Sequence, residues 1–267
     1  MSDICLEFKN LTLGYQGHAA IHHLSGVVER GTLTAIVGAN GSGKSTLMKG
    51  IAGILRPISG TCASHFGRLA YLPQLSELDR SFPARVADLV SLGFWQRRGL
   101  LGRLTRSDRS ALSECLAAVG LSGFEARPLD SLSGGQMQRA LFARTMLQDA
   151  DLILLDEPFN AVDARTISDL VILIKGWVAE GRTVLCVLHD HALVREHIPT
   201  TILLARKLVA WGATVDVLTP ENLLRARGFQ EAWDEKAGWC DEQLPAAEHT
   251  RHSEASALHE KKVAARV

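Results

Sequence analysis

The sequence predicts an α/β fold, in which helices connect the strands of a parallel β-sheet. Three short apolar runs have the length of buried strands: residues 32–37, Leu152–Leu155 and Val184–Leu188. Segments with helical spacing lie between them, at Lys44–Ile54 and Ile167–Glu180. Because parallel strands need a long crossover connection, usually a helix, this alternation indicates a parallel sheet.

Further strands are predicted on either side of the first helix. Ile4–Leu13 alternates apolar and polar residues as a half-buried strand does, and a second short strand is expected near His22–Val28. Residues 68–73 have the pattern of another strand. Before it, the Arg-Pro pair at 56–57 should end the first helix, and the Ser-Gly pair at 59–60 should form a turn.

A helical lobe is predicted within the α/β domain. Residues 76–148 contain no convincing strand pattern, and helical spacing recurs at Val86–Leu92 and Arg109–Val119. The folded domain should cover residues 4–227, and residues 228–267 should form a C-terminal extension. Late in that extension the composition shifts to Ala, His, Glu, Lys and Arg, which predicts partial disorder.

The charge balance and the cysteines argue against several classes of protein. Lys and Arg together number 29, as do Asp and Glu, so the chain lacks the basic excess of a nucleic-acid-binding protein. The five cysteines form no CxxC pair and indicate no zinc or redox motif. No apolar run approaches the roughly 18 residues of a membrane-spanning helix, and the N-terminus does not resemble a signal peptide.

A glycine-rich segment connects the apolar run at 32–37 to the first helix. It reads GANGSGKS and fits the phosphate-binding pattern GxxxxGKS/T in full, in the strand-to-helix context that a chance glycine-rich turn would lack. Glycines allow several backbone N–H groups to point at one anion, and the helix N-terminus adds its positive dipole. Lys44 should reach the β- and γ-phosphates of ATP, and the Ser45 hydroxyl should hold Mg²⁺. The predicted nucleotide-binding residues of this P-loop are Gly38, Ala39, Asn40, Gly41, Ser42, Gly43, Lys44, Ser45 and Thr46.

A pair of acids ends the apolar run Leu152–Leu155. Asp156, at the carboxyl end of a parallel strand beside a P-loop, is placed to hold Mg²⁺ through water. Glu157 is a candidate to orient or deprotonate the attacking water. Two acids at a strand end could also be solvated surface charges, but the P-loop in the same chain favours the catalytic interpretation.

The segment LSGGQ at residues 132–136, followed by Gln138 and Arg139, is the most specific motif. It stands 21 residues before Asp156 and resembles the signature of ATP-binding cassette (ABC) ATPases. The resemblance covers about residues 4–225. It implies a P-loop NTPase core with a RecA-like parallel sheet, an N-terminal antiparallel β subdomain and an inserted helical subdomain. The signature residues implied to contact nucleotide are Ser133, Gly134, Gly135 and Gln136.

The resemblance assigns roles to four further residues. Tyr15 resembles the aromatic residue that stacks on adenine, and Gln74 resembles the Q-loop glutamine, which implies contact with the Mg²⁺ of bound ATP. Asp163, in Ala-Val-Asp at 161–163, resembles the D-loop aspartate, and His189 resembles the switch histidine. Each residue also has an ordinary structural interpretation. Tyr15 could be a surface aromatic and Gln74 a polar loop residue. Asp163 could be a helix cap and His189 a structural histidine.

The resemblance also implies a second chain. Ser133 and two glycines begin a predicted helix and form a second anion-binding nest. In the family this nest caps the γ-phosphate held by the P-loop of another subunit. We therefore expect a homodimer, or a heterodimer with a similar chain, that ATP closes and hydrolysis reopens. Asn160 and Val162 stand where many members carry a small polar residue and Leu, a departure that leaves hydrolysis in place.

The resemblance extends to the type of cargo. Phe82–Val90, followed by Leu-Gly at 92–93, looks like the region after the Q-loop in importers of metal ions and metal chelates, as do Glu157–Phe159 and Asp190. Importers of zinc or manganese resemble the chain more closely than importers of siderophores, haem or cobalamin. A metal site in the histidine-containing tail is an alternative that lacks an organised Cys/His pattern. The histidines concerned are His249, His252 and His259.

The expected partners are integral membrane permease subunits and a periplasmic or extracellular solute-binding protein. Val86–Arg106, with its run of arginines, is the predicted contact with the permease, which would hold the chain at the cytoplasmic face of the membrane. Two other functions are alternatives to transport. An ABC ATPase acting on DNA would carry a long coiled coil between the halves of the cassette, and one acting on the ribosome would carry two cassettes. A cassette without catalysis is opposed by intact Lys44, Asp156, Glu157 and His189.

Overall fold

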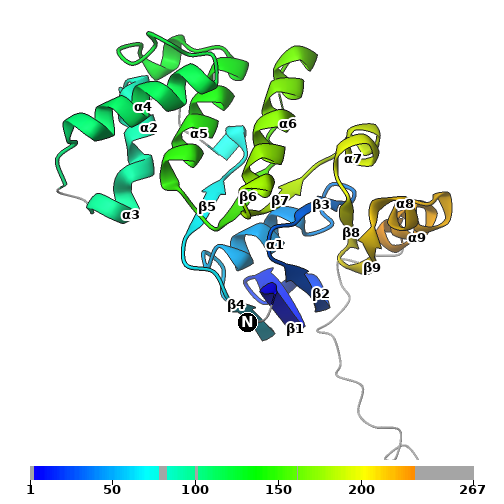
Figure 1. Cartoon of the computed structure of the whole chain (residues 1–267). Coiled ribbons are helices and arrows are strands. Elements are labelled where there is room, and N and C mark those ends of the chain that lie inside the picture. Colours follow the sequence, from blue (N-terminus) through cyan, green and yellow to red (C-terminus); the bar gives the residue numbers. More distant parts are fainter. Residues whose placement is uncertain (1–2, 78–82, 100–101, 161, 232–267) are drawn as a thin grey trace, which may run out of the picture. The chain divides into compact units, whose positions relative to one another are not determined.

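The computed structural model describes residues 3–77, 83–99, 102–160 and 162–231, whose strands form two sheets (Figure 1). The strands are β1 (Ile4–Tyr15), β2 (His18–Glu29), β3 (Leu33–Val37), β4 (Ser59–Ser64), β5 (Leu69–Leu72), β6 (Leu152–Asp156), β7 (Thr183–Val187), β8 (Thr200–Ala205) and β9 (Lys207–Ala213). The helices are α1 (Lys44–Ile51), α2 (Val86–Ser91), α3 (Trp95–Arg98), α4 (Arg106–Ala118), α5 (Gly134–Gln148), α6 (Ala164–Ala179), α7 (His191–His197), α8 (Thr214–Val217) and α9 (Pro220–Glu231).

The larger sheet is the frame of the molecule. Its strand order is β5-β6-β7-β3-β8-β9, and all neighbours are parallel except β8 and β9. Every residue of β3, β6 and β7 is buried, which explains why their sequences are mostly apolar. Because these three strands are adjacent and parallel, their carboxyl ends meet at one edge of the sheet.

The two faces of this sheet contact two different hydrophobic clusters. On β6, Leu152 and Leu154 point into a cluster with α1 and the antiparallel sheet β2-β1-β4, while Ile153 and Leu155 point into a cluster with α5 and α6. This alternation follows from the two-residue period of a strand. Figure 1 shows α1 and the antiparallel strands on one side of the sheet and the helical lobe with α6 on the other.

The helical lobe contains α2, α3, α4 and α5, with α5 packed against α2 and α4 (Figure 1). The start of α4 is fixed by a capping box, in which Thr105 Oγ1 accepts from Asp108 N and the Asp108 carboxylate accepts from Thr105 N. Arg98 also pairs with this carboxylate at 2.8 Å. The bond from Arg98, together with those from Thr105, lowers the pKa of Asp108 to about 2.

The observed elements agree with most of those predicted, and the differences have physical causes. The Ser-Gly pair at 59–60 was predicted as a turn, but it begins β4, whose small side chains form a strand through pairing with β1. The first helix ends at Ile51 rather than Ile54, because Gly53 takes a left-handed φ of +72°. Strands β8 and β9 were not predicted at all.

The C-terminal extension was predicted to begin at residue 228, whereas helix α9 continues to Glu231. The rest of the extension, including its three histidines, lies outside the described residues, and its predicted disorder stays a prediction. In the part of the chain that is described, no helix has both the length and the apolar character needed to cross a membrane.

The stacked pair Phe142 and Trp177 joins the helical lobe to α6, with ring centroids 5.9 Å apart. Phe142 is fully buried, so we expect Phe142→Ala to lower the free energy of unfolding by about 3–5 kcal/mol. Ile172→Ala on α6 is the control, because this side chain is 69% exposed and its loss should cost less than about 0.5 kcal/mol. Urea unfolding of both variants provides the comparison, and equal losses would contradict this packing.

Candidate nucleotide-binding site

The P-loop connects β3 to α1 and requires glycine at two positions. Gly38 has φ +156° and Gly43 has φ +96°. A Cβ atom on Gly38 would lie 2.2 Å from the carbonyl oxygen of Leu204, and one on Gly43 would lie 2.5 Å from Cγ1 of Ile21. Strands β8 and β2 therefore press on the loop from two sides, and only glycine fits there.

The Lys44 side chain folds back over this loop. Its ammonium group donates hydrogen bonds of 2.9 Å to the carbonyl oxygens of Gly38 and Ala39. Burial lowers the pKa of Lys44, while the carboxylates of Glu157 and Asp156 act in the opposite direction. The geometry places a buried cation beside the N-terminus of α1, where an anion is favoured by both charge and dipole.

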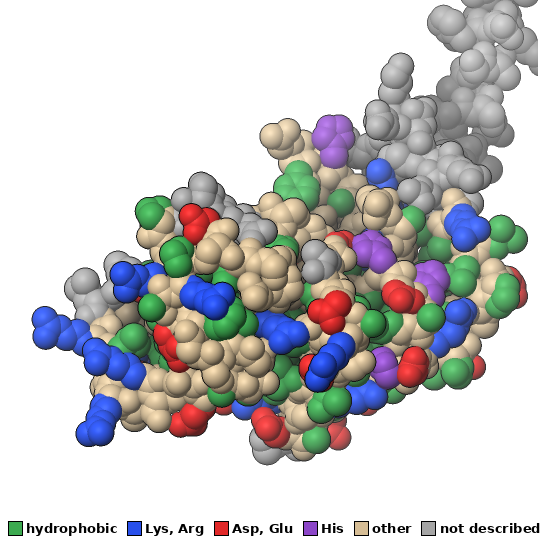
Figure 2. All heavy atoms as spheres, turned by 90° about the horizontal axis from the view of Figure 1, so that it is seen from above, with side chains coloured by type: hydrophobic (Ala, Val, Ile, Leu, Met, Phe, Trp, Pro, Cys, Tyr) green, Lys and Arg blue, Asp and Glu red, His purple; other side chains and the backbone are tan. Residues whose placement is uncertain are grey.

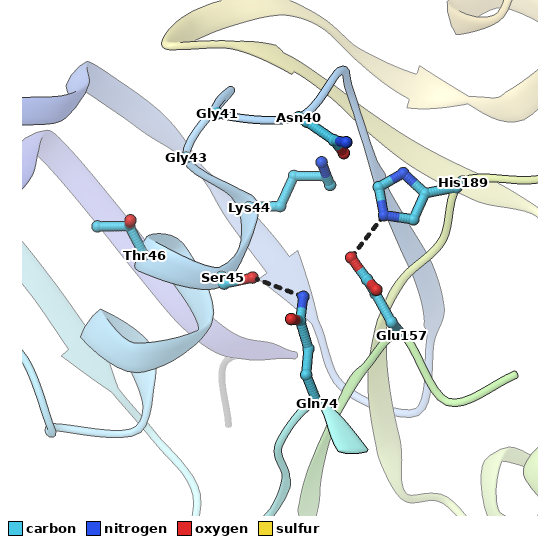
Figure 3. Close-up of a pocket in the computed structure, with 9 residues that line it drawn as sticks. All are labelled: Asn40, Gly41, Gly43, Lys44, Ser45, Thr46, Gln74, Glu157 and His189. Carbon is cyan, nitrogen blue, oxygen red and sulfur yellow. Dashed lines mark hydrogen bonds and ion pairs between the residues drawn. The ribbon is translucent and has the colours of Figure 1, made fainter. Parts of the chain in front are cut away.

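A second group of polar side chains lies where β6 ends. Ser45 Oγ donates to Asp156 Oδ1 at 3.3 Å. Gln74 Nε2 donates to Ser45 Oγ at 3.3 Å (Figure 3). Asp156 is completely buried, and this burial raises its pKa against the opposing bond from Ser45. Hydroxyl, carboxylate and amide oxygens are the ligands that Mg²⁺ takes, so the three residues fit a Mg²⁺ held jointly with ATP phosphates.

Glu157 and His189 meet across the sheet edge. Glu157 follows β6, His189 follows β7, and Nε2 of the histidine lies 2.5 Å from Oε1 of the glutamate (Figure 3). The Glu157 backbone is held by a bond from its N–H to the carbonyl oxygen of Val187 and takes a left-handed φ of +52°. A non-glycine residue in this conformation is uncommon, and strained backbone of this kind occurs at many active sites.

These residues enclose a pocket of about 650 Å³, a size suited to a small ligand. Figure 3 shows the Lys44, Gln74, Glu157 and His189 side chains around one space. The lining residues are Asn40, Gly41, Gly43, Lys44, Ser45, Thr46, Gln74, Glu157 and His189. The structure thus brings together residues that the sequence analysis selected from four separate segments.

Other predicted site residues lie outside this pocket. Tyr15 is at the β1–β2 turn and is 48% exposed. Ser133 caps α5, because its Oγ accepts from Gln136 N at 3.2 Å and its own N–H donates to Gln136 Oε1 at 3.0 Å. Asp163 caps α6 by accepting from Thr166 N at 3.0 Å, as its ordinary structural interpretation requires. The roles assigned to Tyr15, Asp163 and the signature in nucleotide binding stay predictions.

Two residues of the site were missed by sequence reasoning. Tyr71 donates to Asp156 Oδ2 at 3.5 Å, and burial followed by the Asp156 charge raises its pKa. Asn160, noted only as a departure from the family pattern, donates through Nδ2 to Glu157 Oε2. The two-residue period of β5 could have placed Tyr71 on the face of β6 that carries Leu154.

Two arginines of the predicted permease contact have partners within the lobe. Arg97 donates to the carbonyl oxygen of Leu147 at 2.8 Å, and Arg98 forms the ion pair with Asp108 described above. In Figure 2, Lys and Arg side chains gather over the helical lobe. Residues 78–82, 100–101 and 161, which include parts of the predicted cargo, permease and D-loop segments, lie outside the described residues.

Comparison with known proteins identifies the family. The family model described as ABC transporter matches residues 21–160, which span the P-loop, the signature and the acid pair. The chain belongs to the ABC transporter family. Its fold is that of an ABC ATPase cassette, as the sequence predicted.

Three relatives show how far this similarity extends. The zinc transport system ATP-binding protein TroB of Treponema pallidum is 37% identical, over 84% of this chain and 86% of TroB. The manganese transport system ATP-binding protein MntA of Synechocystis is 39% identical, over 83% and 88%. A solved structure, an inward-facing transporter described as a metal-chelate type, matches with TM-score 0.76 and 30% identity, over 85% of this chain and 89% of that one.

The buried Asp156 of this ABC ATPase gives a test in which stability and function change in opposite directions. We expect Asp156→Asn to reduce Mg²⁺-dependent ATP hydrolysis by more than about 100-fold, because it removes a carboxylate that is predicted to hold the metal. In the absence of nucleotide, the same variant should have a higher free energy of unfolding at neutral pH, since it removes a buried charge.

The pH dependence checks the cause of that gain. Burial raises the pKa of Asp156, so the folded state binds this proton more readily than the unfolded chain does. The wild-type protein should therefore have a lower free energy of unfolding than Asp156→Asn at any pH above the folded-state pKa of Asp156. This difference should disappear as the pH falls below the pKa of Asp156 in the unfolded chain. Urea unfolding of both proteins at neutral and acid pH measures the difference, and a variant less stable than wild type at neutral pH would contradict the electrostatic explanation.

Proposed function

We propose that this chain is the ATP-hydrolysing subunit of an ABC importer for a metal ion, zinc or manganese. The pairing of Glu157 with His189 beside the phosphate pocket carries the catalytic part of the proposal. The cargo is supported by the relatives named for zinc and manganese transport, which the chain matches over more than four fifths of its length.

ATP binding follows from the charges of the pocket. The P-loop N–H groups and Lys44 would hold the β- and γ-phosphates, replacing the two loop carbonyls that the ammonium group now contacts. Ser45, Gln74 and Asp156 would hold Mg²⁺, which neutralises charge on the phosphates when bound. Tyr15 would stack on adenine, because its exposed ring lies at the β1–β2 turn before the P-loop.

Glu157 is the proposed general base. Its carboxylate lines the pocket and would orient a water molecule for attack on the γ-phosphate and take its proton. His189 would fix one oxygen of that carboxylate and reach the γ-phosphate from the end of β7. Lys44 stabilises the negative charge that the transferring phosphoryl group carries.

A second copy of the chain would complete each site. The N-terminus of α5, with Ser133, Gly134 and Gly135, is an anion-binding element that does not line this chain's own pocket. An element of this kind fits the γ-phosphate of a partner, so the proposed functional unit is a homodimer with two ATP molecules between its subunits. Asp163 would lie near the same interface.

The remaining partners belong to the transport system. The proposal includes permease subunits that hold the ATPase at the cytoplasmic face of the membrane and a solute-binding protein that delivers the cargo. The helical lobe is the proposed permease contact, through the exposed side chains of Leu92 and Trp95 rather than through Arg97 and Arg98. An importer of metal chelates such as siderophores, haem or cobalamin is the second candidate, favoured by the 30% identity to a metal-chelate type transporter.

A mixture of two inactive variants tests the shared site. Lys44→Ala destroys the P-loop half and Ser133→Arg the signature half, so each alone should lose nearly all ATPase activity. In an equimolar mixture half of the dimers are mixed and hold one complete site, so we expect about a quarter of wild-type activity to return. An inactive mixture, or full activity of Ser133→Arg alone, would contradict the two-chain site.

The catalytic and cargo assignments need separate measurements. We expect Glu157→Gln to bind MgATP normally but to lose more than about 100-fold in kcat.

With its permease in proteoliposomes, the wild-type ATPase should drive uptake of radioactive zinc or manganese, and Glu157→Gln should not. Uptake of an iron-siderophore complex without uptake of free metal would replace the first cargo assignment with the second.

A further inference from the structure

We infer that Asn160 is a positioning residue for Glu157: its amide group holds the carboxylate oxygen that His189 does not contact. This inference rests on the proposed role of Glu157 as the general base. It gives a function to one of the two residues in which this chain departs from the family pattern. Asn160 itself does not line the nucleotide pocket, so it would act through Glu157 rather than on ATP.

The two oxygens of the Glu157 carboxylate have different partners. Oε1 lies 2.5 Å from Nε2 of His189, and Oε2 accepts a hydrogen bond from Nδ2 of Asn160. A terminal carboxylate torsion has broad energy wells, so one contact alone leaves the group free to rotate. Two donors on opposite oxygens fix its plane, and a carboxylate has further lone pairs available to a water in the pocket.

The backbone fixes the distance between the two side chains. Asn160 N donates to the Glu157 carbonyl oxygen at 3.3 Å and closes a turn, while Glu157 N is bonded to Val187 O on β7 at 3.2 Å. Phe159, between them, is partly buried against the hydrophobic cluster that contains α5 and α6. These contacts hold the backbone of residues 157–160, so the two side chains start from fixed Cα positions within reach of each other.

The chemistry of the contact selects asparagine. The donor nitrogen of asparagine lies two bonds beyond Cβ, whereas the hydroxyl oxygen of serine is bonded directly to Cβ and reaches less far. Aspartate has the same shape but no donor at neutral pH, and its charge would repel the Glu157 carboxylate. Alanine removes the contact without adding repulsion.

Steady-state ATP hydrolysis by the full-length chain tests the inference through three substitutions. We expect kcat to fall a few-fold in Asn160→Ser, about tenfold in Asn160→Ala and further in Asn160→Asp. Alanine would leave the Glu157 carboxylate less well oriented, and the charge of aspartate would also push it away. KM for ATP should stay within about twofold of wild type, since Asn160 does not line the nucleotide pocket.

A purely structural role in the turn predicts a different order. Asp and Ser suit turns as well as Asn does, and Ala suits them less, so a structural role would leave Asn160→Asp about as active as Asn160→Ser and more active than Asn160→Ala. That order, or a kcat equal to wild type in all three, would overturn the inference. Thermal unfolding of each variant shows whether a loss of kcat follows a loss of stability.

A double-mutant cycle separates this inference from the proposed function. In a Glu157→Gln background, Asn160→Ala should cause no further loss of the residual rate, because the group that it positions is gone. A further tenfold loss there would overturn the inference. If Glu157→Gln alone keeps its kcat, the general-base assignment itself fails, whereas an inactive Glu157→Gln with fully active Asn160 variants rejects only the role of Asn160.

Discussion

The site depends on one geometric constraint, the adjacency of the parallel strands β6, β7 and β3. Parallel neighbours end at the same edge of the sheet, so residues that are far apart in the chain meet there. Gly38 follows β3, Asp156 ends β6 and His189 follows β7. The hydrophobic clusters on both faces hold the strands in this register, so the packing of the whole domain positions the residues of the phosphate pocket.

The same edge collects charges that are unfavourable without a ligand. Burial lowers the pKa of Lys44 and raises the pKa of Asp156, so each group is shifted towards its neutral form. On the proposed function, a nucleotide phosphate would supply a counter-charge for the lysine, and a bound metal ion would supply one for the carboxylate. The empty site would then lower the stability of the fold, and binding of MgATP would recover it, which would link nucleotide binding to the folding of this edge.

Local sequence signals identified the central strands, the P-loop and the start of α5, because each combines a pattern with a distinctive residue. Strand β4 could not be predicted in this way, since its Ser, Gly, Thr, Cys and Ala residues have no alternation and depend on pairing with β1. Strand β8 did carry a signal, the buried run from Thr201 to Ala205 after Pro199. The contacts of Asn160 and Tyr71 required three-dimensional information, because their partners' side-chain directions are not written in any motif.

In the proposed dimer, one chain holds only half of each ATP site. The specific ATPase activity of the purified chain, measured over a wide range of protein concentration at saturating MgATP, tests this claim most directly. A shared site predicts that activity per chain rises with concentration and reaches a plateau where dimers predominate. An activity per chain that is constant down to concentrations where sedimentation shows only monomers would contradict it.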